Sequence, residues 1–347
     1  MAHKRNTGMG SGRLKSPFIK RYGETIAVVL VFIAILVIGL TVFDDYGVAY
    51  DDPVERETTL SNLKYIVTTF SPSLELPDAL ANAPELLEWK DRHYGVAAQI
   101  PSALVEWIFG FRFHSSRIYK IRHLWVFTQF YIALILFYYL LKRRFRSIVL
   151  AHAGVLMLFL TPRIFADSFY NVKDSVFLSW GIISFYALFR WIEESRKSNL
   201  ILIGIISAIL INTRVIGAFV PAMGLGILFI FRRRGELSTR DWLQQSFILI
   251  LSTIAAWVMI TPYAWHNPLQ VLFETIRRFS AFPQRSMELY RGELIASDQL
   301  PWHYLPVWIA ISMPTVTLIG WLGGIALYLA GFRRRWEDRT GWRWVCA

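Results

Sequence analysis

Long uncharged runs separated by short charged segments dominate the pattern along the chain. The first run, 25–43, holds nineteen residues without a charge, and later runs lie at about 121–141, 147–162, 175–191, 199–213, 215–231, 243–262 and 305–331. A helix of about 20 apolar residues spans a hydrocarbon layer about 30 Å thick. The pattern therefore predicts an all-α polytopic membrane protein with about eight transmembrane helices.

The composition agrees with this class. The 347 residues are 54% hydrophobic and 16% aromatic, with a mean hydropathy of +0.39. Segment 25–43 is longer than the apolar core of a signal peptide and lacks a small-residue cleavage site, so we expect it to be retained as the first span. The single cysteine, Cys346, excludes an intrachain disulfide and a cysteine-based metal cluster.

Basic residues indicate the orientation. If 25–43 runs outward, every Lys/Arg cluster falls on the cytoplasmic side: 4–21, 142–146, 190–197, 232–240 and 333–343. The cytoplasmic segments then carry a net charge of +15 and all others −3, which together make the formal +12. This is a positive-inside signal and not a nucleic-acid patch. We expect a multi-pass protein of a bacterial inner membrane, with both termini cytoplasmic and no nucleic-acid partner.

The same orientation divides the chain into three parts. Residues 1–24 and 333–347 are expected as cytoplasmic tails, and 25–332 as the transmembrane domain. Its two large outer loops would be about 44–120 and 263–304, with short outer turns at 163–174 and 212–216. Stretches 55–70 and 98–111 in the first loop are predicted to be amphipathic helices along the membrane surface.

Ionisable and polar residues gather at the outer ends of several spans, where they are costly and mark candidate functional groups. Asp44, Asp45, Asp51 and Asp52 follow the first span. The sequences "PRIFADSFYNVKDS" (162–175), "NTRVIG" (212–217), "TPYAWHNP" (261–268) and "LPWHYLPVW" (300–308) follow or precede others. Carboxylates and cations are thus expected to converge on the outer face of the bundle.

Each group also has a structural interpretation. The aspartate pairs can simply end a helix, and Arg163, Lys173 and Arg214 can form ion pairs with Asp167, Asp174 or a first-loop aspartate. The aromatic residues at 302–308 fit an interfacial belt. His266 and His303 could ligate zinc, but two histidines without a matched carboxylate are weak evidence, and no metal site is predicted.

Taken together, the groups fit transfer chemistry on a lipid phosphate. A carboxylate can act as general base toward a hydroxyl, and Arg or Lys can hold a phosphate by charge-assisted hydrogen bonds. A lipid-linked substrate would bring its phosphate to the interface and keep its tail in the bilayer. The sequence contains no P-loop or dinucleotide-binding fingerprint.

The order of these motifs resembles the GT-C superfamily of polyprenyl-phosphate-sugar-dependent glycosyltransferases, in particular family-39-like, protein O-mannosyltransferase-type membrane enzymes. The matching stretches are "DDYGVAYDDP", "HYG" (93–95), "RHL" (122–124), "PRIFADSFYNVKDS", "NTRVIG" and "PWHYLPVW". No single motif is specific for this superfamily. The ordered series of motifs from Asp44 to about Pro314 is more specific. The resemblance implies a GT-C-like fold and transfer of a sugar from a polyprenyl-phosphate donor to a lipid, glycan or protein acceptor.

The resemblance also implies residue roles. Asp51 and Asp52 match the family's Asp-Glu dyad, with Asp51 as the general base of an inverting reaction and Asp52 shorter than the family's Glu. Lys173, Arg214 and Arg163 would bind the donor phosphate. Substrate-positioning roles would fall to Asp174, Asn171, His303 and Tyr304. No cofactor is required, although a divalent cation at the aspartates is compatible with the sequence.

One departure and two rival interpretations remain open. Similar proteins usually continue through several more spans, so the chain is either a short member or C-terminally truncated. A transporter or flippase for a lipid-linked or anionic substrate would also place charges in a membrane, although it tends to place them near the midplane. A non-catalytic paralogue would retain the motifs without activity. The sugar, the acceptor and the oligomeric state are not encoded in any motif.

Overall fold

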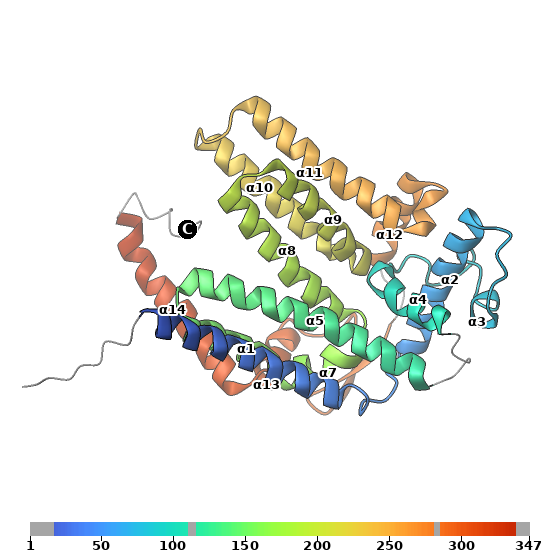
Figure 1. Ribbon diagram of the computed structural model, residues 1–347, viewed down its shortest axis with the longest axis horizontal. Helices are drawn as coiled ribbons and strands as arrows, with labels where there is room; N and C mark the ends of the chain where they lie inside the picture. The colour runs from blue at the N-terminus through green and yellow to red at the C-terminus, as the bar shows by residue number, and fades with distance from the viewer. Residues whose placement is uncertain (1–16, 110–115, 281–284, 338–347) are drawn as a thin grey trace, which may run out of the picture.

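The computed structural model describes residues 17–109, 116–280 and 285–337, of which Figure 1 gives the arrangement. Of the described residues, 76% are helical. Within these residues the chain forms these elements: α1 (Pro17–Val42), α2 (Asp52–Phe70), α3 (Asp78–Ala81), η1 (Ala97–Gln99), α4 (Ile100–Ile108), α5 (Ser116–Phe145), α6 (Ile148–Phe159), α7 (Pro162–Tyr170), α8 (Asp174–Glu194), α9 (Lys197–Thr213), η2 (Val215–Ala218), α10 (Phe219–Arg233), α11 (Thr239–Ile260), η3 (Pro262–Trp265), α12 (Pro268–Ser280), β1 (Met287–Tyr290), β2 (Glu293–Ala296), α13 (Tyr304–Ser312) and α14 (Thr315–Glu337).

Five segments of the described chain are long and apolar enough to cross a membrane. They are Gly23–Val42, Ser116–Phe145, Asp174–Glu194, Val215–Arg233 and Thr239–Ile260. The number rises to seven if two bent helix pairs each count as one span. The predicted span at 199–213 corresponds to α9, a shorter apolar helix of 17 residues. The membrane class is thus supported, whereas the count of eight stays a prediction.

Prolines lie at the bends of these two helix pairs. α6 and α7 meet at 66° where Pro162 follows Thr161, and α13 and α14 meet at 120° where Pro314 follows Met313. Both residues before the prolines are extended, as steric contact with the proline ring requires. The predicted outer turn at 163–174 is therefore wrong for its first half, because 162–170 is the helix α7.

Two apolar clusters hold the bundle together. One joins α1, α5, α6 and α7 through aromatic rings such as Phe127, which stacks on Phe169 with centroids 5.2 Å apart. The other joins α8, α9, α10 and α11 around Trp191 and Leu249. α5 packs against α8 and links the two halves. Figure 1 shows these long helices running side by side along the bundle.

α2 differs from the predicted surface helix at 55–70. It packs against α3, α4 and η3, and it buries polar residues together with apolar ones. Glu55, Arg56 and Asn62 are all at most 4% exposed. An amphipathic interfacial helix would keep its charged face in water, so the prediction is wrong for α2. In α4 the apolar Ile108 is exposed, as a surface helix requires, but the charged Glu106 is buried.

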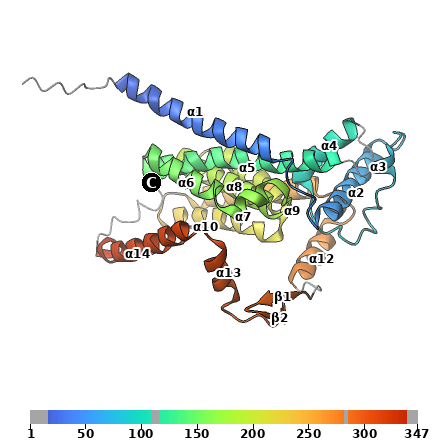
Figure 2. The same ribbon diagram turned by 90° about the horizontal axis from the view of Figure 1, so that it is seen from below.

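A β-hairpin departs from the all-helical expectation. β1 pairs antiparallel with β2 between α12 and α13. Arg291 and Gly292 form the turn with φ of 55° and 90°, the left-handed conformations that a tight two-residue hairpin turn requires. Only glycine adopts such a φ without steric cost. In Figure 2 the hairpin projects from the bundle below α12 and α13.

The chain reversals group at two ends of the bundle. In Figure 1 the α10–α11 connection lies at the opposite end from α2, α3 and α4. The predicted tails 1–24 and 333–347 fall mostly outside the described residues, although α1 begins at Pro17 and α14 extends to Glu337. The end that carries α2 and α4 also holds the cavity described next.

Candidate functional site

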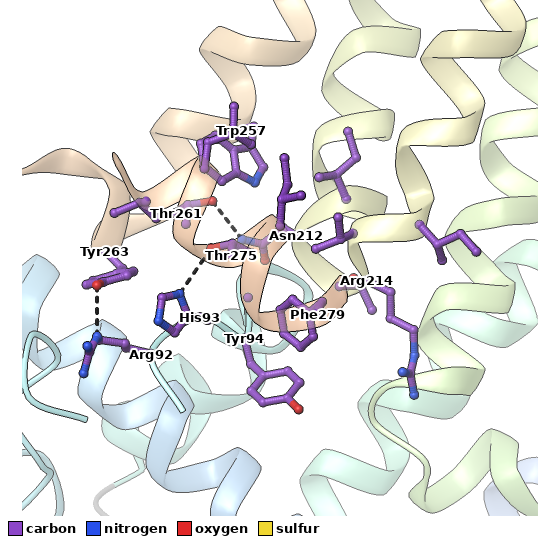
Figure 3. A pocket seen from close by; sticks show the side chains of 18 of the residues that line it. Arg92, His93, Tyr94, Asn212, Arg214, Trp257, Thr261, Tyr263, Thr275 and Phe279 are labelled. Atoms are coloured by element: carbon purple, nitrogen blue, oxygen red, sulfur yellow. Dashed lines mark hydrogen bonds between the residues drawn. The ribbon is translucent and has the colours of Figure 1, made fainter. Parts of the chain in front are cut away.

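A cavity of about 330 Å³ opens where the segment before η1 meets α9, η2, α11, η3 and α12. Figure 3 shows its lining. Polar and charged lining residues include Arg92, His93, Tyr94, Lys173, Asn212, Thr213, Arg214, Thr261, Tyr263 and Thr275. Trp257, Ile216, Leu272 and Phe279 form apolar parts of the wall. A compact pocket with apolar walls and a few convergent polar groups is typical of a ligand site.

Three of the sequence motifs meet at Asn212. Its side-chain oxygen accepts a hydrogen bond from the Ala97 amide at 2.9 Å, and its nitrogen donates to the Thr261 hydroxyl at 2.9 Å. Gly95 lies so close that a Cβ there would be 2.1 Å from the Asn212 carbonyl oxygen. The "HYG", "NTRVIG" and "TPYAWHNP" stretches are therefore packed together, and the glycine is required by this close approach.

Lys173 enters the site from the start of α8. Its Nζ lies 2.5 Å from Glu55 Oε1 and 3.7 Å from the ring centroid of Tyr94. Burial raises the pKa of Glu55, and the neighbouring Lys173 opposes this rise by stabilising the charged form. Asp51 also acts electrostatically on Glu55, so this aspartate lies near the same pair.

Asp174 and Arg214 form a second ion pair, with Oδ1 and Nη2 2.5 Å apart. Both side chains are more than 40% exposed, so water screens the pair. Asn171 fixes the turn before α8, because its Oδ1 accepts hydrogen bonds from the amides of Lys173 at 3.1 Å and Asp174 at 2.7 Å. The structural interpretation is thus confirmed for Arg214, which pairs with Asp174, whereas Lys173 pairs with the glutamate Glu55 instead of an aspartate.

The aspartates of the predicted dyad occupy different environments. Asp51 is exposed at the residue before α2, whereas Asp52 is 1% exposed. Asp52 Oδ2 accepts a hydrogen bond from the Ala49 amide at 3.0 Å and lies 3.5 Å from His123 Nε2. Of the two carboxylates, Asp51 is the one that a substrate from solution can reach.

Behind the dyad lies a buried charged cluster. Arg56 of α2 is paired with Glu106 of α4, and both side chains are 5% exposed. Arg122 of α5 is 1% exposed, and its guanidinium donates no hydrogen bond within the described part of the chain. The charges of Asp52, Glu55 and Glu106 all act on it. This cluster connects α2, α4 and α5 beneath the site.

Of the predicted site residues, Lys173 and Arg214 line the cavity. The other seven do not: Asp51, Asp52, Arg163, Asn171, Asp174, His303 and Tyr304. Three of these seven make contacts elsewhere. Arg163 is on α7, where its Nε lies 3.8 Å from Asp167 Oδ2. His303 Nδ1 lies 2.6 Å from the Tyr290 hydroxyl of the hairpin. Tyr304 packs edge-to-face on the ring of Tyr290, with centroids 5.1 Å apart. His303 and Tyr304 therefore anchor the hairpin to α13.

Several lining residues were not singled out from the sequence. Arg92 directly precedes the "HYG" motif, and Thr275 belongs to α12. His93 Nδ1 lies 3.2 Å from the Thr275 hydroxyl, and the rings of His93 and Tyr263 meet edge-to-face at 5.2 Å. Burial, together with the charges of Arg278 and Arg92, lowers the pKa of His93. The position of Arg92 directly before the motif residue His93 could have identified it from the sequence. No motif in α12 pointed to Thr275.

The described residues contain no group of three His, Cys, Asp or Glu side chains placed to hold a metal ion. His266 Nδ1 lies 2.7 Å from the Tyr263 carbonyl oxygen instead. A divalent cation at Asp51 and Asp52 stays a prediction from the sequence.

Comparison with known proteins gives no relative. No family model matches the chain, and no curated protein or solved structure is detectably similar to it. The GT-C resemblance therefore rests on the motifs alone.

Proposed function

We propose that the protein is a membrane glycosyltransferase that moves a sugar from a polyprenyl-phosphate donor to an acceptor on the outer side of the membrane. One observation carries the proposal. Lys173 and Arg214, from separate helix ends, line the same cavity beside helices apolar enough to lie in a bilayer. Asp51 acts electrostatically on Glu55, the ion-pair partner of Lys173. A ligand with an anionic head and an apolar tail fits such a boundary.

The roles follow from exposure and charge. Lys173 and Arg214 would compensate the donor phosphate by shifting from Glu55 and Asp174 toward the incoming oxygens, since charge-assisted hydrogen bonds to phosphate are strong. Asp174 and Asn171 hold the start of α8 in place. Asp52 would support Asp51 from the interior and take no part in proton transfer, because it is buried.

The reaction needs one proton acceptor and one leaving group. Asp51 would accept the proton of the acceptor hydroxyl as the hydroxyl oxygen attacks the anomeric carbon. The new oxygen–carbon bond forms while the bond from that carbon to the phosphate oxygen breaks. The polyprenyl phosphate leaves with the electron pair, and Lys173 and Arg214 stabilise its charge. Attack opposite the leaving group inverts the anomeric centre.

The test is transfer by the full chain in proteoliposomes. A panel of polyprenyl-phosphate hexoses and pentoses is supplied with a membrane-lipid extract as acceptor, and release of polyprenyl phosphate is measured. We expect D51N to lower the rate by at least about 100-fold, the scale of a lost general base. D45N is the matched control, since Asp45 is an equally exposed carboxylate after the first span.

The outcomes separate the candidates. Full transfer by D51N would show that another group is the base. Movement of donor across the vesicle membrane without release of the lipid phosphate would favour a flippase instead. An inactive protein that binds no donor would agree with a non-catalytic paralogue.

A further inference from the structure

The charges of the cavity lining have one sign. Among the lining residues, Arg92, Lys173 and Arg214 carry full positive charges, and no Asp or Glu is present. Lys173 and Arg214 are each paired with a carboxylate just outside the lining. Arg92 lies elsewhere, since Figure 3 shows it on the opposite side of His93 from Arg214. The cavity thus has a second basic end that the donor phosphate does not use.

Arg92 is held in place by neutral groups. Its Nε donates to the Tyr263 hydroxyl at 2.9 Å and its Nη1 to the Trp89 carbonyl at 3.2 Å. The guanidinium carbon lies 5.4 Å from the Tyr263 ring centroid. Arg92 forms no ion pair within the described chain, and its Nη2 donates no hydrogen bond there. A positioned guanidinium with a free donor and no directly paired carboxylate is suited to an anionic oxygen.

Neighbouring charges strengthen this end. Arg278 of α12 donates to the Lys90 carbonyl at 3.2 Å, and its charge acts on His93. Its Nε is buried and has no hydrogen-bond partner among the described residues. Glu274 is the opposing group, and it reaches the Tyr263 hydroxyl at 3.2 Å. Two guanidinium groups, Arg92 and Arg278, and one carboxylate, Glu274, act on His93, so positive charge is in excess around this side chain.

The space between the two ends suits a sugar ring. Tyr94, Trp257 and Phe279 supply flat apolar surfaces, while His93 and Thr275 supply hydrogen-bonding atoms. Figure 3 shows these side chains around the same hollow, between Arg92 and Arg214.

We propose that the Arg92 end of the cavity binds a second anionic group of the donor, in addition to the phosphate at Lys173 and Arg214. Two sources have this chemistry: the carboxylate of an acidic sugar and the second phosphate of a diphosphate linkage. The inference rests on the proposed function and adds to it a donor class, one with two anionic groups. Cationic amino sugars are disfavoured by the same charges.

The experiment compares three donors on one polyprenol in proteoliposomes of the full chain. They are a phosphate-linked neutral hexose, a phosphate-linked hexuronic acid and a diphosphate-linked neutral hexose, each followed by release of the lipid carrier and by equilibrium binding. We expect one doubly anionic donor to exceed the neutral donor about tenfold in kcat/KM, equivalent to about 1.4 kcal/mol. The donor that does so identifies the source.

Variants test the residue. R92Q should erase the preference, chiefly through a higher KM for the doubly anionic donor, so that this donor loses about tenfold more than the neutral donor does. R92K keeps the charge and should keep part of the preference, which separates charge from a folding defect. R277Q is the matched control, because Arg277 is an exposed neighbour on α12 outside the lining.

Two outcomes would overturn the inference. Equal use of all three donors, or an equal loss for all three in R92Q, removes the second anionic site while the glycosyltransferase proposal stands. Turnover of none of the donors, with equal binding of all three, would overturn both proposals together.

Discussion

At the residue scale, the buried pair Arg56–Glu106 near the site should be costly to break. Both side chains are 5% exposed, so neither charge has water as an alternative partner. E106Q would leave the Arg56 guanidinium without its carboxylate, which should cost about 3–5 kcal/mol of unfolding free energy. Denaturant unfolding in mixed micelles measures the change.

An exposed pair gives the control for that substitution. Arg285 and Asp298 lie 3.0 Å apart with side chains 59% and 60% exposed. D298N should therefore change the unfolding free energy by less than about 1 kcal/mol. Equal effects of E106Q and D298N would show that burial does not govern the Arg56–Glu106 pair.

Single residues also mark how far sequence reasoning reaches. The sequence indicated that charges gather near Asp51, Lys173 and Arg214. Lys173 and Arg214 line one cavity, and Asp51 acts electrostatically on Glu55, the partner of Lys173. It could not predict that Asp52 is buried while Asp51 is exposed, because Asp52 lies against residues such as His123 of α5, 71 positions away. It also missed Glu55, the partner of Lys173, because a carboxylate inside an apparently amphipathic stretch looks solvated.

At the scale of elements, the contact between the loop before η1 and the end of α9 positions the cavity. G95A would place a methyl group 2.1 Å from the Asn212 carbonyl oxygen, which is backbone and has little freedom to move. We expect G95A to lose most folded protein or most activity, measured by size-exclusion yield and by donor turnover. G181A is the control, since a Cβ at Gly181 on α8 meets nothing within 4 Å.

The control G181A has its own expected effect on stability. Alanine in a helix interior is favoured over glycine by up to about 1 kcal/mol, so G181A should be neutral or slightly stabilising. If G95A folds and works as well as G181A, the three motifs are not held by this contact.

Helix breaks were partly readable from the sequence. Pro162 and Pro314 lie inside apolar runs, and each stands where a helix bends, so the local signal was present. The burial of α2 could not be predicted from its local sequence. Its polar side chains are covered by α3, α4 and η3, and such coverage depends on the packing of distant segments rather than on the period of its own residues.

At the scale of the whole molecule, the two ends of the bundle differ in the segments they carry. The exposed Ser71 follows α2 at one end, and the exposed Glu236 lies in the α10–α11 connection at the other. Figure 1 shows these two regions far apart along the long helices. The excess of Lys and Arg near Glu236 predicts that this end faces the cytoplasm.

Single cysteines at these positions test the orientation and, with it, the side on which the proposed reaction takes place. In a C346A background, an impermeant maleimide should label S71C in intact cells, whereas E236C should be labelled only after the membrane is opened. The physical reason is that the two residues would lie on opposite sides of a hydrocarbon layer about 30 Å thick. The reverse pattern would place the cavity on the cytoplasmic side, where an outward-facing acceptor has no access. Labelling of both cysteines in intact cells would contradict a bundle that spans the membrane between these two ends.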